Sequence, residues 1–236
     1  MYFLSRDCFV CKMGCYWIVL SARRDRYLCV AHNELVSIGH LLHGWAHLDS
    51  PLTQSLSLGD EVNTLIRSLI SNEIITSTAA NGKAFAEFEY PAPETSLEAP
   101  EQFPSPHLPF LSIVRFFVAC GTVDWRLRTE PLPRTLARID RRRQRVNSKA
   151  TNHGASHAAQ LVAAFKSLRP LYPRSYLCLF DSLAMLEFLA LFHCFPRMVF
   201  GVVADPFEAH CWLQEGPTVL NDVLECVGRF KSILSV

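Results

Sequence analysis

Three residues in the last sixty positions carry the side chains that nucleophilic catalysis requires. Cys178 can act as the nucleophile, His210 as its base, and Asp222 as the group that orients the base. Cys178 directly precedes the almost wholly apolar stretch from Leu179 to Phe192, which predicts a helix buried on all sides. A cysteine in the first turn of a helix faces unpaired amides and the positive end of the helix dipole, and both favour the thiolate. The pattern therefore indicates a cysteine nucleophile.

His210 and Asp222 lie in two stretches that we expect to pair. Residues 207–214 and 218–222 predict two antiparallel strands, with residues 215–217 as the turn between them. A three-residue loop places His210 opposite Asp222, with Cβ atoms about 4.5–5.5 Å apart, so that the carboxylate can hold the imidazole in one tautomer. A two-residue loop would shift the pairing by one residue and put the two side chains on opposite faces. The interpretation therefore depends on the turn.

Each of these residues also has a structural interpretation. A single cysteine is more often part of a buried core than a nucleophile, and a single histidine on a strand is more often structural. Asp181, one turn after Cys178, would disfavour a thiolate unless it points to solvent or pairs with a base, and Ser175 is the expected cap of the helix. The combination of the three residues, in the order Cys, His, Asp, favours a catalytic triad over these separate explanations.

The composition limits the classes of protein to consider. The chain has 236 residues, half of them apolar and 19% charged, which indicates a packed globular protein. A net charge of +1 provides no general attraction to nucleic acid or to an anionic membrane. Nine cysteines without a small secreted framework favour reduced thiols in a cytoplasm. Charged residues interrupt the apolar start of the chain and both later apolar stretches, so we predict neither a signal peptide nor a membrane span.

The elements that position the three residues belong to the second of two predicted domains. Residues 1–78 predict a small unit in which a hairpin within residues 2–30 precedes helices at 33–45 and 59–75. Six of the fourteen prolines lie between Pro91 and Pro109, and residues 79–109 are the predicted linker. Residues 110–236 form the second domain. Before Cys178 we predict three further helices in it, at 110–120, 134–146 and 156–168.

Two other groups of residues allow rival functions. The arginine-rich run from Arg134 to Arg145 is compatible with nucleic-acid binding, but no aromatic platform or recognition motif accompanies it, so we interpret it as a solvated helix face. Cys8, Cys11 and Cys15 are compatible with zinc binding, but there is no second CxxC pair and the spacing lies within a predicted strand. We therefore expect no nucleic-acid partner and no metal site.

The C-terminal stretch resembles the C-terminal domain of lasso-peptide B proteins, which are leader peptidases with a transglutaminase-like, papain-related fold. The resemblance covers residues from about 110 to 236 and rests on Cys178-Leu179, Ser182-Leu183-Ala184, Gly201-Val202, Pro206-Phe207, Ala209-His210, Trp212 and Leu220-Asn221-Asp222. It implies that Cys178 is the nucleophile, His210 the base and Asp222 the orienting group. Two residues depart from the family pattern: Cys211 stands where we expect alanine, and Asp181 stands where a basic residue is frequent.

Residues 1–78 resemble the small winged-helix domains that recognise precursors in peptide-maturation systems. This resemblance rests on the order of hairpin and helices and on residues 23–27. It implies an α+β protein in which a winged-helix-like domain binds the leader peptide as an added strand, ahead of the transglutaminase/papain-like cysteine peptidase domain. The family also implies dependence on a partner, the asparagine-synthetase-like lasso cyclase that uses ATP, with no cofactor bound to this chain. The alternatives are a transglutaminase-like acyl transferase, a non-catalytic peptide-binding adaptor and a winged-helix DNA-binding protein.

Overall fold

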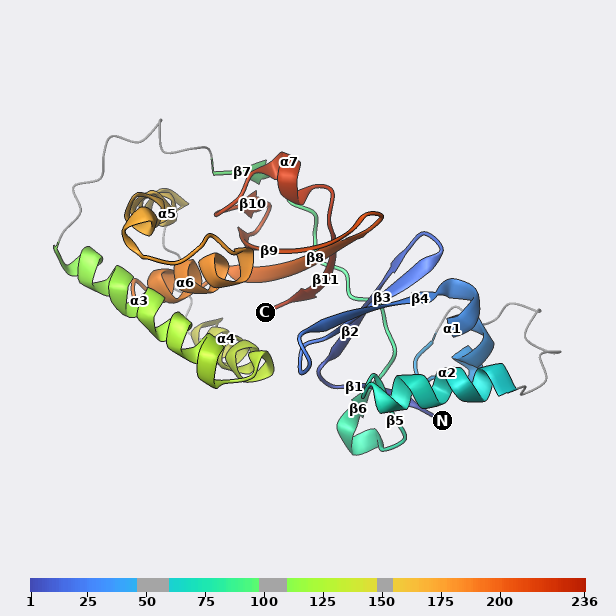
Figure 1. Cartoon of the computed structure of the whole chain (residues 1–236). Helices are drawn as coiled ribbons and strands as arrows, with labels where there is room; N and C mark the ends of the chain where they lie inside the picture. The colour runs from blue at the N-terminus through green and yellow to red at the C-terminus, as the bar shows by residue number, and fades with distance from the viewer. Residues whose placement is uncertain (46–59, 98–109, 148–154) are drawn as a thin grey trace. The chain divides into compact units, whose positions relative to one another are not determined.

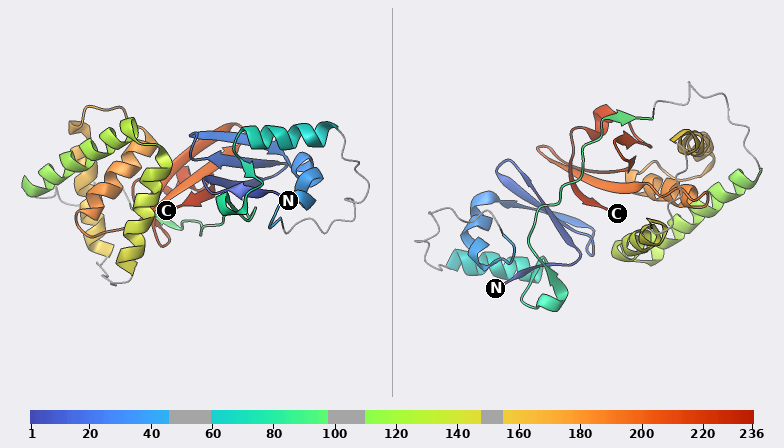
Figure 2. Two further views of the ribbon diagram at one scale, coloured as in Figure 1. Left: turned by 90° about the horizontal axis from the view of Figure 1, so that it is seen from below. Right: turned by 180° about the vertical axis from the view of Figure 1, so that it is seen from behind.

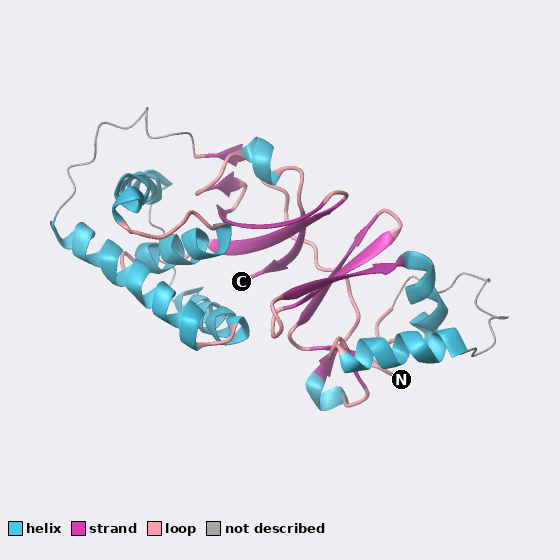
Figure 3. Cartoon of the chain, in the orientation of Figure 1, coloured by secondary structure: helices cyan, strands magenta, loops and turns pink. Residues whose placement is uncertain are grey.

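The computed structural model describes residues 1–45, 60–97, 110–147 and 155–236. Its fold is mixed α+β, as the sequence predicts. The chain divides into two compact units, the first formed mainly by Met1–Glu89 and the second mainly by Tyr90–Gly201 and Ala209–Phe230. Figure 1 labels the helices and strands of both units, and Figure 3 distinguishes them by colour.

The first unit is built on an antiparallel meander of strand order β2-β3-β4. Its strands are β2 (Cys8–Met13), β3 (Tyr16–Ser21) and β4 (Arg26–Ala31). The pairing of β3 with β4 confirms the predicted hairpin, and Asp25 adopts a φ of 49° in the turn between them. A short residue such as aspartate tolerates this left-handed conformation better than most other side chains do.

The remaining elements of the first unit are short strands and helices. A second sheet of order β5-β1-β6 contains β1 (Phe3–Ser5), β5 (Ile75–Thr76) and β6 (Gly82–Lys83). The helical elements are α1 (His32–Ile38), η1 (Gly39–Leu41), α2 (Asp60–Ser71) and η3 (Ala79–Asn81). Helices α1 and α2 both end earlier than the helices predicted at 33–45 and 59–75. The second ends at Ser71 because Glu73 takes a φ of 58° and Ile75 pairs with Leu4 in the sheet.

Aromatic side chains form part of the core of this unit. The rings of Trp17, Trp45 and Phe85 have centroids 4.7–5.9 Å apart. Burial of side chains of this size stabilises a fold by roughly 1.5–3 kcal/mol each. Cys8 and Cys11 are buried in the strand, whereas Cys15 is exposed. Within the described ranges these three thiols belong to no group of metal-ligating side chains.

Most of a mixed sheet and a group of helices form the second unit. The strand order is β11-β8-β9-β10-β7, with β7 (Thr95–Ser96), β8 (Arg197–Ala204), β9 (Phe207–Glu215), β10 (Thr218–Val219) and β11 (Lys231–Ser235). The helices are α3 (Phe110–Thr129), α4 (Leu132–Asn147), α5 (Ala155–Leu168), η5 (Arg169–Leu171), α6 (Cys178–Ala190) and α7 (Leu224–Val227). Helix α6 packs against α3 and α5, as the two views of Figure 2 show.

The segment that the sequence predicts as a linker contributes to this sheet. Strand β7 lies inside residues 79–109 and pairs in parallel with β10. The backbone carbonyl of Pro91 accepts a hydrogen bond of 3.1 Å from the Gln214 side chain. Residues 98–109 of the predicted linker lie outside the described residues. The first part of the segment is thus anchored to the second unit by hydrogen bonds.

Helix α6 is the central helix of the second unit, and its apolar sequence explains why. Nine of its side chains are buried, which confirms the predicted buried helix. Its one buried acid, Glu187, accepts hydrogen bonds from Arg126 at 2.7 Å and from Arg142 at 2.9 Å. Because Arg126 belongs to α3 and Arg142 to α4, these bonds connect three helices through one carboxylate. Removal of one partner from a buried pair is costly, since the other charge stays buried.

The arginine run is only partly the solvated face that we predicted. Arg134 and Arg141 are exposed. In contrast, Arg138 forms an ion pair with Glu130, and Arg142 is bound to Glu187. Half-buried arginines of this kind hold the helices together. Among the described residues, no helix has both the length and the apolar composition that crossing a bilayer would require.

Candidate active site

Cys178 is the first residue of α6, as the sequence predicts. Leu177 precedes it in an extended conformation, and Cys178 is exposed while most of the helix behind it is buried. The predicted cap, Ser175, is wrong: the N-cap residue is Leu177, and no side chain of that residue caps the helix. Instead, the Leu177 N–H donates to the carboxylate of Asp181 at 2.8 Å. The thiol therefore lies at the amide-rich end of a rigid helix.

Asp181 is paired with a basic side chain, so its negative charge does not stand uncompensated beside the Cys178 thiolate. Its carboxylate accepts a hydrogen bond from Arg169 Nε, and the Arg169 side chain is buried. The same guanidinium donates to the backbone carbonyls of Tyr172, at 3.1 Å, and of Arg174, at 3.0 Å. Arg169 thus neutralises Asp181 and also holds the loop that leads to Cys178. Sequence reasoning missed Arg169, because nothing along the chain marks it as a partner of Asp181.

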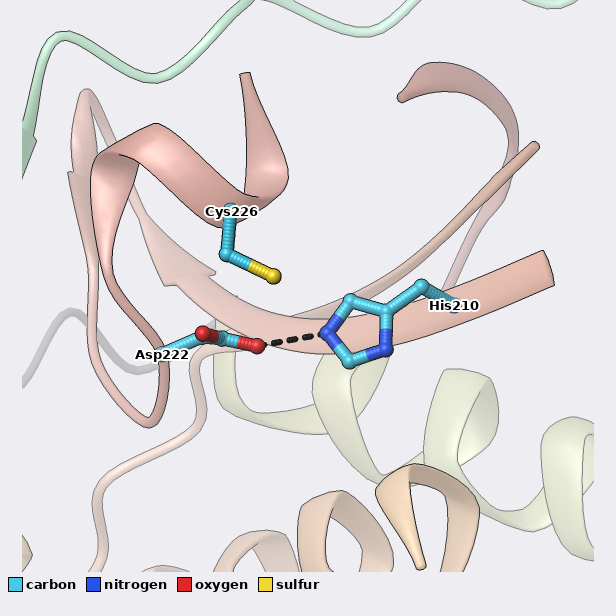
Figure 4. Close-up of side chains that lie close together, drawn as sticks. All are labelled: His210, Asp222 and Cys226. Carbon is cyan, nitrogen blue, oxygen red and sulfur yellow. Dashed lines mark hydrogen bonds and ion pairs between the residues drawn. The ribbon is translucent and has the colours of Figure 1, made fainter. Parts of the chain in front are cut away.

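His210 and Asp222 are in direct contact. His210 Nε2 lies 2.5 Å from Asp222 Oδ2, and Figure 4 shows the imidazole edge facing the carboxylate. The His210 ring also packs beside the ring of Trp212, with centroids 6.2 Å apart, and beside Phe230 at 5.3 Å. The carboxylate and the flanking rings together fix the orientation of the imidazole.

The predicted strand register between these two residues is wrong. Thr218 pairs with Glu215 and Val219 with Gln214, so the loop has two residues, Gly216 and Pro217, and the pairing is shifted by one position. Continued regularly, this register would put the side chains of His210 and Asp222 on opposite faces. The contact forms because β10 ends at Val219 and the chain bends over residues 220–222.

Asn221 explains how the chain leaves the sheet at this point. Its side-chain Oδ1 accepts a hydrogen bond of 2.7 Å from the Leu213 N–H. Its Nδ2 donates to Ser182 Oγ at 2.9 Å, and that hydroxyl donates to the Cys211 carbonyl at 3.1 Å. These three bonds connect the bend, α6 and β9. They hold the strand that carries His210 at a defined distance from the helix that carries Cys178.

Cys178 is hydrogen-bonded to the strand residues His210 and Cys211. A hydrogen bond from the Cys211 thiol, followed by one from His210, lowers the pKa of Cys178 to about 4 against the opposing effect of burial. The hydrogen bond to Asp222 and then the one to Cys178 raise the pKa of His210 to about 9. Because Nε2 is engaged by Asp222, Nδ1 is the ring nitrogen that remains for the hydrogen bond with the thiol. Between these two pKa values the pair is a thiolate and an imidazolium.

Cys211, which departs from the family pattern, is part of this arrangement. Its side chain is buried, and the thiolate of Cys178 beside it, together with burial, raises the pKa of Cys211 well above its ordinary value. Cys211 therefore stays a neutral thiol and donates to its neighbour. An alanine at this position would not supply that hydrogen bond.

Asp222 has further partners besides His210. Burial favours the neutral acid, but hydrogen bonds from His210 and from the Val223 N–H, the latter at 2.7 Å, lower the pKa of Asp222 overall. The Cys226 thiol, in the short helix α7, is a weaker donor to the same carboxylate. Asp222 is thus ionised at neutral pH and can stabilise a charged imidazole. Sequence reasoning did not identify Cys226, because one cysteine in a short helix carries no recognisable signal.

The comparison with known families agrees with this geometry. Residues 119–235 match the transglutaminase-like superfamily. No curated protein and no solved structure matches the chain. The C-terminal part of the chain is therefore a transglutaminase-like domain, and it contains all three residues that the structure brings together. Domains of this superfamily usually act as cysteine peptidases or as acyl transferases with Cys, His and Asp at the site.

Proposed function

We propose that the chain is a cysteine peptidase that removes the leader from a ribosomally made lasso-peptide precursor, in the cytoplasm. Cys178 is the nucleophile, His210 the base and Asp222 the group that orients the base. The observation that carries the proposal is the hydrogen-bonded chain from Cys178 through His210 to Asp222, which favours the thiolate at neutral pH. A thiolate at a helix start, next to an imidazolium, is the arrangement that cysteine peptidases use.

The proposed reaction follows from these positions. The Cys178 thiolate attacks the carbonyl carbon of the bond between leader and core, and the imidazolium of His210 donates its Nδ1 proton to the leaving amine. Water, deprotonated by the now neutral imidazole, then breaks the thioester and releases the leader acid. The backbone amide of Cys178, at the first helical position, is a suitable oxyanion donor. The released core amine is the substrate of the partner cyclase, which supplies the ATP dependence of the pathway.

The first unit offers an edge on which a leader peptide can add as a strand. The outer edge of β2 is already covered, because the Phe88 N–H donates to the Val10 carbonyl and the Lys12 N–H donates to Glu87. In the described ranges, β4 pairs with β3 alone, and Leu28 and Cys29 on it are exposed. We therefore assign leader binding to β4 within a winged-helix-like domain of residues 1–78, joined by residues 79–109 to the peptidase domain of residues 110–236.

The test compares cleavage with leader binding. Wild-type protein and Cys178→Ala are incubated with a lasso-peptide precursor in which the leader is still joined to the core, and products are identified by mass. The variant should release no leader yet bind a fluorescent leader peptide with unchanged affinity. Cys15→Ala, which removes an exposed thiol of the first unit, is the matched control and should cleave normally. Full cleavage by Cys178→Ala would end the proposal.

The superfamily match also supports a second reaction, in which an amine replaces water. The same thioester would then give an amide, as in acyl transfer of the transglutaminase kind. Product masses separate the two reactions when a primary amine is added. A peptidase gives the leader acid, whereas a transferase gives the leader amide.

A further inference from the structure

A group of metal-ligating side chains lies around the Nε2 atom of His210. His210 Nε2, a carboxylate oxygen of Asp222 and the Cys226 thiol all lie within 4.8 Å of one another. Figure 4 shows the thiol and the imidazole both directed toward the carboxylate. In the part of the chain that the structure describes, no other set of three such side chains comes this close together. All three residues are partly exposed, so an ion can reach them from solvent.

The donor set is that of zinc. One imidazole nitrogen, one carboxylate and one thiolate are the three kinds of ligand that zinc accepts in proteins, and water completes a tetrahedral site. With metal–ligand distances of about 2.0–2.3 Å, the ligand atoms of a tetrahedral ion lie roughly 3.4 Å apart. The observed separations bracket this value, since Nε2 and Oδ2 are 2.5 Å apart and the group spans at most 4.8 Å. Side-chain adjustments of about 1 Å would therefore form the site.

We propose that His210, Asp222 and Cys226 bind a zinc ion, and that this ion inhibits the peptidase by replacing the hydrogen bond between His210 and Asp222. The inhibition, though not the binding, rests on the proposed function. Zinc takes the Nε2 lone pair, so the proton on that nitrogen and the proton of the Cys226 thiol are both released. The ring then keeps one proton at Nδ1, and its Nε2 is no longer free to bond with Asp222. A metal-bound imidazole is a poor acid, so it cannot protonate the leaving amine.

The test must separate this site from a metal held between Cys178 and His210 Nδ1. Cobalt(II) is the probe, because a cobalt–thiolate bond produces a charge-transfer absorption band. The full chain with Cys178→Ala should keep the band, and Cys226→Ser should lose it and bind zinc at least about 100-fold more weakly in calorimetry. Circular dichroism of each variant verifies that it is folded. A band that survives Cys226→Ser and disappears in Cys178→Ala would overturn the proposal.

Inhibition is measured separately on the wild type and on Cys226→Ser. Each protein is assayed for precursor cleavage with and without zinc, and a chelator is then added. Zinc should reduce wild-type cleavage at least tenfold, the chelator should restore it, and Cys226→Ser should need a much higher zinc concentration. Equal sensitivity of the two proteins would refute the inhibitory role. Because cobalt binding is read without substrate, absence of peptidase activity would leave the binding test intact.

Discussion

The start of α6 and the interior of β2 each carry a cysteine, and the two thiols have opposite properties. Burial, with a smaller contribution from the charge of Glu87, raises the pKa of Cys11, in β2, to about 12, whereas hydrogen bonds from Cys211 and His210 lower the pKa of Cys178 to about 4. Cys120, inside α3, behaves like Cys11. The residue type by itself therefore does not make a nucleophile. What matters is a set of donors that approach the sulfur from a neighbouring strand.

The largest expected effect is the selectivity of alkylation. At pH 6, iodoacetamide should label Cys178 at least about 10⁴-fold faster than Cys11, because Cys178 is ionised and accessible and Cys11 is neither. Mass spectrometry of the digested protein measures both rates. The exposed thiol of Cys15 is the internal control for accessibility. If Cys178 reacted no faster than Cys15, the proposed activation of the thiol at the start of α6 would be refuted.

The next effect concerns the carboxylate that holds the imidazole. Asp222→Asn should reduce precursor cleavage by roughly 10²–10⁴-fold, because the amide neither stabilises the imidazolium nor fixes its orientation. Steady-state kinetics should place the loss in kcat. Asp205→Asn, at an exposed aspartate in the turn between β8 and β9, should cleave at the wild-type rate. Equal losses in the two variants would show that the effect is not specific to Asp222.

Substitution of Arg169 tests whether the loop before Cys178 contributes to the difference in pKa between Cys178 and Cys11. Arg169→Gln should lower the free energy of unfolding by about 3–5 kcal/mol, since it leaves the Asp181 carboxylate without its cation. It should also raise the pKa of Cys178, measured by the pH dependence of alkylation. The double variant Arg169→Gln/Asp181→Asn should recover part of both losses. If the double variant were as unstable as the single one, charge compensation would not be the role of Arg169.

The pH dependence defines the limits of the activated state. The Cys178 thiolate is lost as pH falls through about 4, and the His210 proton is lost as pH rises through about 9. Cleavage should therefore follow a bell-shaped profile with a plateau between these values, and it should be about 100-fold slower at pH 11 than on the plateau. The rate of Cys178 alkylation should rise with pH along the acid limb of this profile. An alkylation midpoint near pH 8 or above would indicate an ordinary thiol.

The smallest expected effect is that of the second thiol. Cys211→Ala should raise the pKa of Cys178, because it removes the first of the hydrogen bonds that stabilise the thiolate. One hydrogen bond to a charged group contributes about 1.5–3 kcal/mol, which is about one to two pKa units, so alkylation at pH 5 should slow by roughly two- to fifteenfold. Cys211→Ser, which keeps a donor, should slow it less. An unchanged rate in Cys211→Ala would assign the activation to His210 alone.

Much of the local structure is predictable from the sequence. The apolar run after Leu177 predicts α6, and the aromatic and branched side chains of residues 16–20 and 27–30, separated by a polar stretch, predict the hairpin of β3 and β4, because these patterns lie in residues that are adjacent along the chain. The register of β9 and β10 was not predictable. A loop of two or three residues around Gly216 has no distinct signature, yet it decides which side chains share a face.

The order of elements and the position of Cys178 at the start of a buried helix can be predicted from the sequence, since both depend on residues that are neighbours along the chain. Three contacts are visible only in the folded domain: His210 meets Asp222 through a bend, Arg169 neutralises Asp181, and Cys211 donates to Cys178. Hydrogen bonds and ion pairs act over a few Å, and the groups that form them here come from separate helices, strands and bends. Their convergence is a property of the packed domain.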